Sequence, residues 1–206
     1  MRPLTSRGAE LLWVLLALLP LVVAGCGTSQ PSQFYVLRPL PESERSVPTT
    51  PDKVALAVLV GPVTLPAYLD RTQVVTLVGA HEVAADEFIR WAEPLHENFT
   101  RVLVENLSLL LNTPEVYAFG HLGSTSVDYQ IIIDVTRFDT NANGGADLTA
   151  FWRVVGKDSK APLLKKKSVF RAAAASAGIT QILEAQNQTL TDFSREVATA
   201  IQALPR

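Results

Sequence analysis

The sequence predicts a single α/β domain in which a mixed β-sheet of about six to eight strands is covered by two main amphipathic helices. Short segments rich in Val and Ile, separated by turn residues, predict the strands. Two longer segments with apolar residues at intervals of three and four predict the helices. The stretch from Cys26 to Arg206 suits one domain with a substantial core, and its slight excess of acidic over basic residues gives no basis for nucleic-acid binding.

The strands are predicted between clusters of proline, glycine and polar residues. They are Phe34–Leu37, Lys53–Val63, Thr72–Val78, Glu82–Phe88, Val116–Phe119, Asp128–Thr140, Ala146–Val155 and Pro162–Ala175. Gly61-Pro62 is expected to interrupt the second strand, Leu65–Asp70 forms a bend, and the proline-rich stretch Pro41–Pro51 is a loop. Asn143–Gly145 can supply the positive φ angles that a hairpin turn needs.

The clearest helix is predicted from Pro94 to Leu111, because proline is tolerated in the first turn of a helix. A second helix is predicted from Thr180 to Leu204. The apolar stripes comprise Leu95, Phe99, Val102, Leu103, Leu107, Leu110 and Leu111 in the first helix, and Leu183, Leu190, Phe193, Val197, Ile201 and Leu204 in the second. One face of each helix is therefore expected to pack on the sheet.

The amino-terminal 25 residues have the features of a secretory signal peptide. Arg2 and Arg7 precede an uncharged apolar run from Leu11 to Val23, and small residues follow. As a helix this run is about 20 Å long, whereas a bilayer core needs about 30 Å. The run is therefore better suited to a removable signal than to a permanent membrane anchor.

The sequence Val23-Ala24-Gly25-Cys26 resembles a bacterial lipobox. This resemblance implies cleavage between Gly25 and Cys26 and attachment of lipid to Cys26. The alternative is that Cys26, the one cysteine of the chain, is an incidental thiol beside an ordinary cleavage site. Residues 26–32 are expected to form a short tether, and residues 33–206 the folded domain. In enteric-type bacteria, an aspartate directly after the lipidated cysteine retains a lipoprotein at the inner membrane. Gly27 stands at this position instead, which favours an outer-membrane location.

No catalytic or metal-binding signature is present in the sequence. It lacks a nucleophile elbow, a phosphate-binding loop, a dinucleotide fingerprint and a zinc-protease motif. His81, His96 and His121 stand in unrelated contexts, so neither a metal site nor another cofactor is expected. Carboxylates gather around the long predicted hairpin, where solvation of strand ends is the favoured interpretation over acid–base chemistry or Ca²⁺ binding; they are Asp128, Asp134, Asp139 and Asp147.

Three further features allow more than one interpretation. Lys165–Lys167 on a predicted strand can face anionic lipid head groups or an acidic partner, or can protect an edge strand against aggregation. Four aromatic residues can contact lipid or form ordinary core, namely Trp91, Phe138, Phe151 and Trp152. The Asn-x-Ser/Thr triplets at Asn98, Asn106 and Asn187 are interpreted as chance.

Several stretches together resemble one known family. They are Val60–Arg71 (VGPVTLPAYLDR), Gln73–Val75, Arg90–Leu95 (RWAEPL) and Arg101–Leu107 (RVLVENL), with Phe34–Leu37, Asp128–Asp139 and Ser194–Val197 fitting the same layout. These residues are similar to the PqiC family, also called YmbA-like or ABC-type transport auxiliary lipoproteins. The resemblance covers essentially the whole chain after the predicted signal peptide.

The resemblance implies an outer-membrane lipoprotein on the periplasmic face that is not an enzyme. Its implied partner is an MCE-domain tunnel protein similar to PqiB, together with a possible inner-membrane permease. The implied mechanism is docking: the lipoprotein holds the far end of the tunnel at the outer membrane. Assembly of several copies into a homo-oligomeric ring is also plausible for the family.

The bend between the second and third strands is the candidate partner-binding segment. If it is exposed, Tyr68 offers an amphipathic contact and Asp70 and Arg71 offer charges, with Pro66 and Leu69 beside them. The alternative is that the segment shapes a local bend and packs inward. Two other functions stay open for the chain: a periplasmic lipid-binding carrier, and a structural envelope lipoprotein unconnected to transport. An envelope hydrolase with dispersed catalytic residues is the least supported by the sequence.

Overall fold

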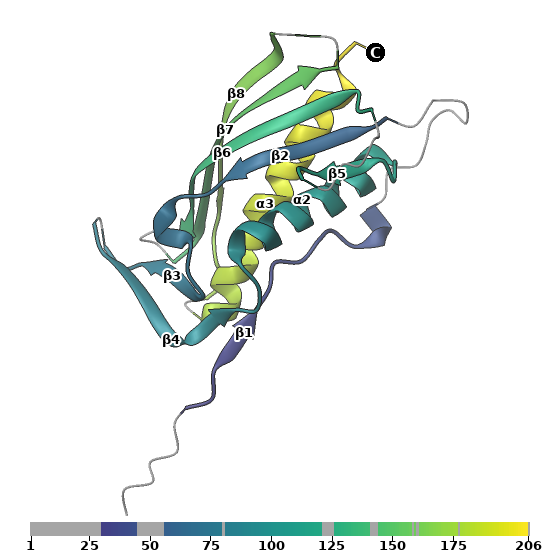
Figure 1. The fold of residues 1–206 in the computed structure, drawn as a ribbon. Coiled ribbons are helices and arrows are strands. Elements are labelled where there is room, and N and C mark those ends of the chain that lie inside the picture. Colours follow the sequence, from purple (N-terminus) through teal and green to yellow (C-terminus); the bar gives the residue numbers. More distant parts are fainter. Residues whose placement is uncertain are drawn as a thin grey trace, which may run out of the picture. The chain divides into compact units, whose positions relative to one another are not determined.

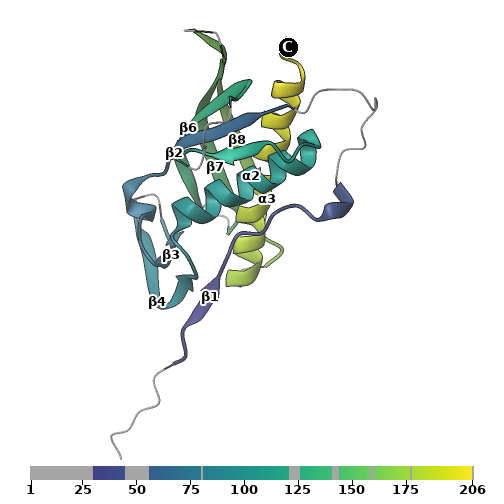
Figure 2. The same cartoon turned by 45° about the vertical axis from the view of Figure 1, so that its right-hand side comes forward.

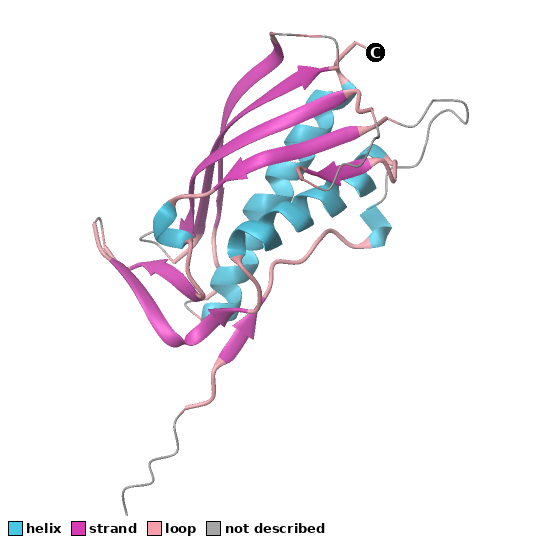
Figure 3. Cartoon of the chain, viewed as in Figure 1, coloured by secondary structure: helices cyan, strands magenta, loops and turns pink. Residues whose placement is uncertain are grey.

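The computed structural model describes residues 30–44, 56–79, 81–120, 126–140, 144–157, 159, 161–176 and 178–205. The predicted signal peptide, the cleavage site at Gly25 and the lipidated Cys26 lie outside these ranges. From Ser32 onward the chain forms one compact unit. In its described part, two α-helices accompany eight strands arranged in two sheets (Figures 1 and 3). The predicted α/β class, with two main helices and six to eight strands, is confirmed.

The larger sheet has five strands in the order β5-β2-β6-β7-β8. Their bounds are β5 Val116–Ala118, β2 Val58–Thr64, β6 Tyr129–Thr140, β7 Ala146–Gly156 and β8 Pro162–Ala172. β2 runs parallel to both of its neighbours, β5 and β6. β6, β7 and β8 form an antiparallel meander. The sheet is therefore mixed, and β8 is its edge strand on the side of the meander.

The two faces of this sheet differ because side chains alternate along each strand. The inner face is buried, with Ile131, Ile133 and Val135 on β6 and Trp152 and Val154 on β7. Two helices cover it, α2 (Leu95–Leu111) and α3 (Ile179–Gln202), and both lie on the same side of the sheet (Figures 1 and 2). The outer face carries the intervening residues and has no helix over it among the described elements.

Aromatic rings join the helices to the inner face. Phe99 of α2 meets Phe138 of β6 edge to face, with ring centroids 5.1 Å apart. Phe193 of α3 meets Trp152 of β7 in the same way at 6.1 Å. Trp91, Phe138 and Trp152 thus belong to the core, and Phe151 alone of the four aromatic residues considered in the sequence lies on the outer face.

The helix predicted from Pro94 is confirmed, and so is its end. Pro94 precedes the first helical residue, and Asn112 ends α2 with a left-handed backbone at φ 51°. Asparagine adopts this conformation more readily than most residues, and it commonly follows the last helical turn. The second helix is confirmed as Ile179–Gln202.

The smaller sheet has three strands in the order β1-β4-β3. β3 (Gln73–Leu77) and β4 (Val83–Trp91) form the predicted antiparallel hairpin, and β1 (Gln33–Tyr35) pairs with the end of β4 in parallel. Residues 83–88 of β4 are exposed on both faces, whereas Trp91 at its end is buried. The hairpin is therefore joined to the core by Trp91 of β4 and by the buried Val74 and Val75 of β3.

Two local features differ from the sequence expectations. The proline-rich loop contains a short 3₁₀ helix, η1 (Glu42–Glu44). β2 continues through Gly61-Pro62 as a strand, with a shift in register between Val60 and Val63. Gly61 has φ +115°, and a Cβ atom there would lie 2.8 Å from Phe119 Cβ. Glycine is therefore what lets the strand bulge here rather than end.

A helix that crosses a bilayer must be both long and apolar, and the helices of the described chain can be compared with that requirement. None of them combines the length and the apolar character that crossing a bilayer requires.

Candidate docking surface

The bend predicted at Leu65–Asp70 is a short 3₁₀ helix, η2 (Ala67–Leu69), in the connection from β2 to β3. The Leu69 amide donates to the Pro66 carbonyl at 2.9 Å, and the Asp70 amide donates to the Ala67 carbonyl at 3.1 Å. These bonds turn Leu69 into the core, where it is buried. Asp70 and Arg71 are exposed.

Tyr68 points back onto the large sheet. Its hydroxyl donates to Asp139 Oδ2 at 2.5 Å. Arg137 Nε donates to the other oxygen of Asp139 at 2.7 Å, and Arg137 Nη1 lies 3.0 Å from Asp147 Oδ2. Arg171 of β8 approaches Asp147 as well, at 3.8 Å. Tyr68 is therefore part of a charge network at the β6–β7 turn, and of the predicted contact residues only Asp70 and Arg71 are fully available to a partner.

The network raises the pKa of Tyr68 above its ordinary value near 10. Partial burial of the ring is the first cause, because it disfavours the phenolate. The hydrogen bond to Asp139 and the negative charge of that carboxylate act in the same direction, and Arg137 opposes them. The hydroxyl thus stays protonated and keeps donating its hydrogen bond.

The sequence favoured solvation of all four hairpin carboxylates, but the structure shows that only some of them are solvated. Asp139 and Asp147 are buried and are paired with arginines. Asp128 is exposed and accepts a hydrogen bond from the Ala57 amide at 2.8 Å, and Asp134 accepts one from Thr64 Oγ1 at 2.6 Å. The pairing register of β6 and β7 places Asp139 directly opposite Asp147. Arg137 and Arg171 compensate the negative charges of these two buried carboxylates.

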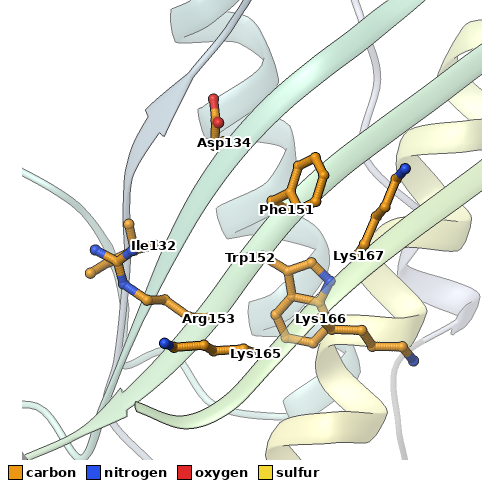
Figure 4. A pocket seen from close by; sticks show the side chains of 8 residues that line it. All are labelled: Ile132, Asp134, Phe151, Trp152, Arg153, Lys165, Lys166 and Lys167. Atoms are coloured by element: carbon orange, nitrogen blue, oxygen red, sulfur yellow. The ribbon is translucent and has the colours of Figure 1, made fainter. Parts of the chain in front are cut away.

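The other half of the outer face is positively charged and open. Arg153, Lys165 and Lys167 lie there and are called the cationic face below (Figure 4). Arg153 is the cross-strand partner of Lys165, and Phe151 is that of Lys167. Among the residues that the structure describes, none of these three cations forms an ion pair; Lys167 Nζ lies 5.3 Å from the centre of the Phe151 ring.

Lys166 belongs to the opposite face of the same strand. Its ammonium lies 3.1 Å from Glu196 of α3, which also accepts a hydrogen bond from Ser168. The run Lys165–Lys167 is thus divided by the pleat: Lys165 and Lys167 lie on the outer face, and Lys166 lies on the face that the helices cover. Because β8 is an edge strand, both interpretations of the lysine run still apply: it can protect that edge against aggregation, and it can bind a ligand.

The asparagines of the three Asn-x-Ser/Thr triplets have a shared structural role that the sequence did not reveal. Leu37 N donates to Asn98 Oδ1 at 2.6 Å, Arg38 N to Asn187 Oδ1 at 2.8 Å, and Leu40 N to Asn106 Oδ1 at 2.7 Å. Asn106 also donates to Ser194 Oγ at 3.0 Å. The signal available in the sequence was the placement of Asn98 and Asn106 beside the apolar stripe of α2, where a buried amide needs a partner.

These contacts fasten the segment after β1 to both helices. Residues 37–40 run without regular secondary structure, so their amides depend on side-chain acceptors. Residues 37–40 are thus hydrogen-bonded to both α2 and α3 through the three asparagines.

The histidines do not converge. His96 Nε2 lies 2.8 Å from the Val63 carbonyl oxygen, His81 is exposed, and His121 lies outside the described residues. Within the described part of the chain, no three His, Cys, Asp or Glu residues are grouped in a way that could hold a metal ion.

The fold is an α/β domain whose segment after β1 is hydrogen-bonded to both helices. Comparisons with known proteins identify the family to which it belongs. The model of the ABC-type transport auxiliary lipoprotein component family matches residues 35–198, and the chain belongs to that family. Membership implies a membrane-anchored location in the cell envelope and association with an ABC-type transport system.

Solved structures share the fold. A crystal structure of an uncharacterized protein is 20% identical, covers 84% of this chain and 99% of its own, and superposes with a TM-score of 0.65. A protein from Xanthomonas campestris is 16% identical, with coverage of 82% and 94% and a TM-score of 0.64. No curated protein matches the chain.

Proposed function

We propose that this chain is an outer-membrane lipoprotein that acts as a non-enzymatic docking component of an MCE-type intermembrane lipid-transport complex. The observation that carries the proposal is the family match, which spans nearly the whole folded unit from residue 35 to residue 198. The family is auxiliary to transport, and the resemblance seen in the sequence extends this to an MCE-domain tunnel protein similar to PqiB, with a possible permease.

The proposed anchor is lipid on Cys26, added after cleavage behind Gly25. The tether of residues 26–32 spans at most about 25 Å when extended. The folded unit would therefore stay close to the periplasmic surface of the membrane, within reach of a tunnel that ends there. Several acyl chains on one residue hold a protein to a membrane far more firmly than a single chain does.

The proposed partner contact is the segment containing Pro66, Tyr68, Leu69, Asp70 and Arg71. Its supporting feature is the pair of exposed charges that follows η2, held in place because Leu69 is buried and Tyr68 is bonded to Asp139. Tyr68 thereby positions the pair, and Asp70 and Arg71 make the contact.

Affinity purification of the tagged chain from membranes, with mass spectrometry of proteins and lipids, tests the function. The expected result is an MCE-domain protein in the captured material, lost when Cys26→Ser releases the chain from the membrane. Capture without any MCE-domain protein contradicts the proposal, and bound lipid without a partner would favour a lipid carrier instead.

A variant pair tests the contact segment. Asp70→Ala/Arg71→Ala should lower partner capture, whereas Glu97→Ala, an exposed residue of α2, should leave it unchanged. Unchanged capture by the double variant, with the fold intact by circular dichroism, removes this segment from the interface.

A further inference from the structure

The open half of the outer face combines unpaired cations with exposed apolar side chains. We propose that this surface binds anionic phospholipid head groups, with Arg153, Lys165 and Lys167 contacting phosphates and Phe151 and Val169 resting in the interfacial region. This inference requires no MCE-domain partner, so its test is independent of the proposed function.

The cations are concentrated by the pairing of β7 with β8. Register places Arg153 directly opposite Lys165, and Lys167 lies two residues further along the same face. Like charges opposite each other on a sheet destabilise it. Elsewhere the described chain pairs its strand cations: Arg137 with Asp139 and Lys166 with Glu196. The cationic face thus carries an excess of positive charge on a chain whose formal net charge is −2.

Exposed apolar residues lie on the same face as the cations. Phe151 is 48% exposed and Val169 49%. Strand alternation puts Val169 on the side of β8 that also carries Lys165 and Lys167. Long basic side chains can extend to phosphates while such apolar groups sit at the head-group boundary.

The shape of the surface favours a lipid layer over a folded acidic partner. Its residues surround an open depression of about 480 Å³ lined by Ile132, Asp134 and the cationic face (Figure 4). Asp134, the one carboxylate among these lining residues, accepts a hydrogen bond from Thr64, and the three cations leave positive charge in excess there. Flexible lysines on an open sheet face suit many mobile head groups of one charge, whereas a protein partner is held mainly by aromatic anchors in closed pockets.

The test measures contact of this face with a bilayer to which the full chain is attached by its amino terminus. An environment-sensitive fluorophore is placed at Val169→Cys, or at Thr199→Cys on the exposed side of α3 as the positional control, and intact mass confirms one fluorophore per chain. The vesicles contain phosphatidylcholine alone or with phosphatidylglycerol, plus a nitroxide lipid that quenches a nearby fluorophore.

Quenching is expected at position 169 only, only with phosphatidylglycerol, and less at high salt. Each cation removed should lower the ratio of docked to undocked chain about fivefold, so Arg153→Gln/Lys165→Gln should lower it by roughly 25-fold. Arg101→Gln/Lys166→Gln, which removes two paired cations from the helix side, is the matched control and should keep the quenching.

Equal quenching in both kinds of vesicle, or equal losses in the two double variants, would overturn the proposal. So would absence of quenching in every vesicle. If the fluorophore at position 169 then responded to polyglutamate, the cationic face would instead bind an acidic polypeptide.

Discussion

The inner and outer faces of the five-stranded sheet are built from alternating residues of the same strands, yet they have opposite chemistry. On β7, Trp152 and Val154 are buried beneath α3, whereas Phe151 and Arg153 face outward. On β8, Lys166 reaches Glu196 of α3, and its neighbours Lys165 and Lys167 have no acidic partner in the described chain. A residue's environment is thus set by its face of the sheet rather than by its neighbours along the chain.

The outer face is itself divided. Its end near the β6–β7 turn is closed by Tyr68 and neutralised by the pairing of Arg137 with Asp139 and Asp147. Its other end carries the cationic face. Packing therefore stabilises the inner face, ion pairing organises one end of the outer face, and the remaining end is left available for binding.

The largest expected difference between the faces is in packing. Phe138→Ala should lower the free energy of unfolding by about 3–5 kcal/mol, because the ring is fully buried against Phe99. Phe151→Ala on the outer face should cost less than about 1 kcal/mol. Chemical denaturation of both variants measures the difference, and similar losses would contradict the assignment of the two faces.

The buried amide of Asn98 should matter nearly as much as core packing. Asn98→Ala leaves the amide of Leu37 without its acceptor inside the protein, so we expect a loss of about 1–3 kcal/mol. Asn187→Ala should cost less, because the Arg38 amide that it serves can bond to water. Denaturation gives the stability, and faster hydrogen exchange at residues 37–40 should accompany the Asn98 change. Unchanged exchange there would argue against a role of Asn98 in holding residues 37–40 to α2.

The closed end of the outer face predicts a dependence on alkaline pH. The pKa of Tyr68 is raised in the folded state, so its contribution to stability is complete below the unfolded pKa near 10 and is lost as pH rises above it. Tyr68→Phe should cost about 1 kcal/mol near neutral pH, and its deficit relative to the unmodified chain should shrink as pH passes about 10. Denaturation across this range tests the sign, and a constant deficit would contradict it.

The smallest expected effect reverses sign between adjacent lysines. Lys165→Glu places a carboxylate opposite Arg153 and should stabilise the fold by about 0.2–1 kcal/mol. Lys166→Glu places one against Glu196 and should destabilise it. Both effects should weaken with added salt. Thermal melts at two ionic strengths suffice, and shifts of the same sign would show that the two lysines do not face opposite sides.

Local patterns in the sequence predicted most elements correctly. Spacing of apolar residues after Pro94 identified α2, and the turn residues around Gly144 identified the long β6–β7 hairpin. These features depend on residues that are close together in the chain, so a short stretch of sequence is enough to predict them. The division of eight strands into two sheets was not visible, because parallel pairing of β1 with β4 joins segments more than fifty residues apart.

The candidate surfaces were predictable only in part. The bend at Pro66–Arg71 and the lysine run were recognised, but the burial of Asp139 and Asp147 and the hydrogen bond from the Leu37 amide to Asn98 were not. Each of these depends on a partner from a distant element, such as Arg137 reaching across to β7. A polar residue in a strand or helix looks the same in the sequence whether water or a buried partner satisfies it.

The sequence by itself determined the helices, the hairpins, the family resemblance and the lipobox pattern, since all of these are recorded in short stretches of chain. Tertiary structure alone decided which side of each strand the helices cover. That choice buries one set of alternating residues and leaves the other in solvent, and it therefore decides which lysines are paired and which are free to bind.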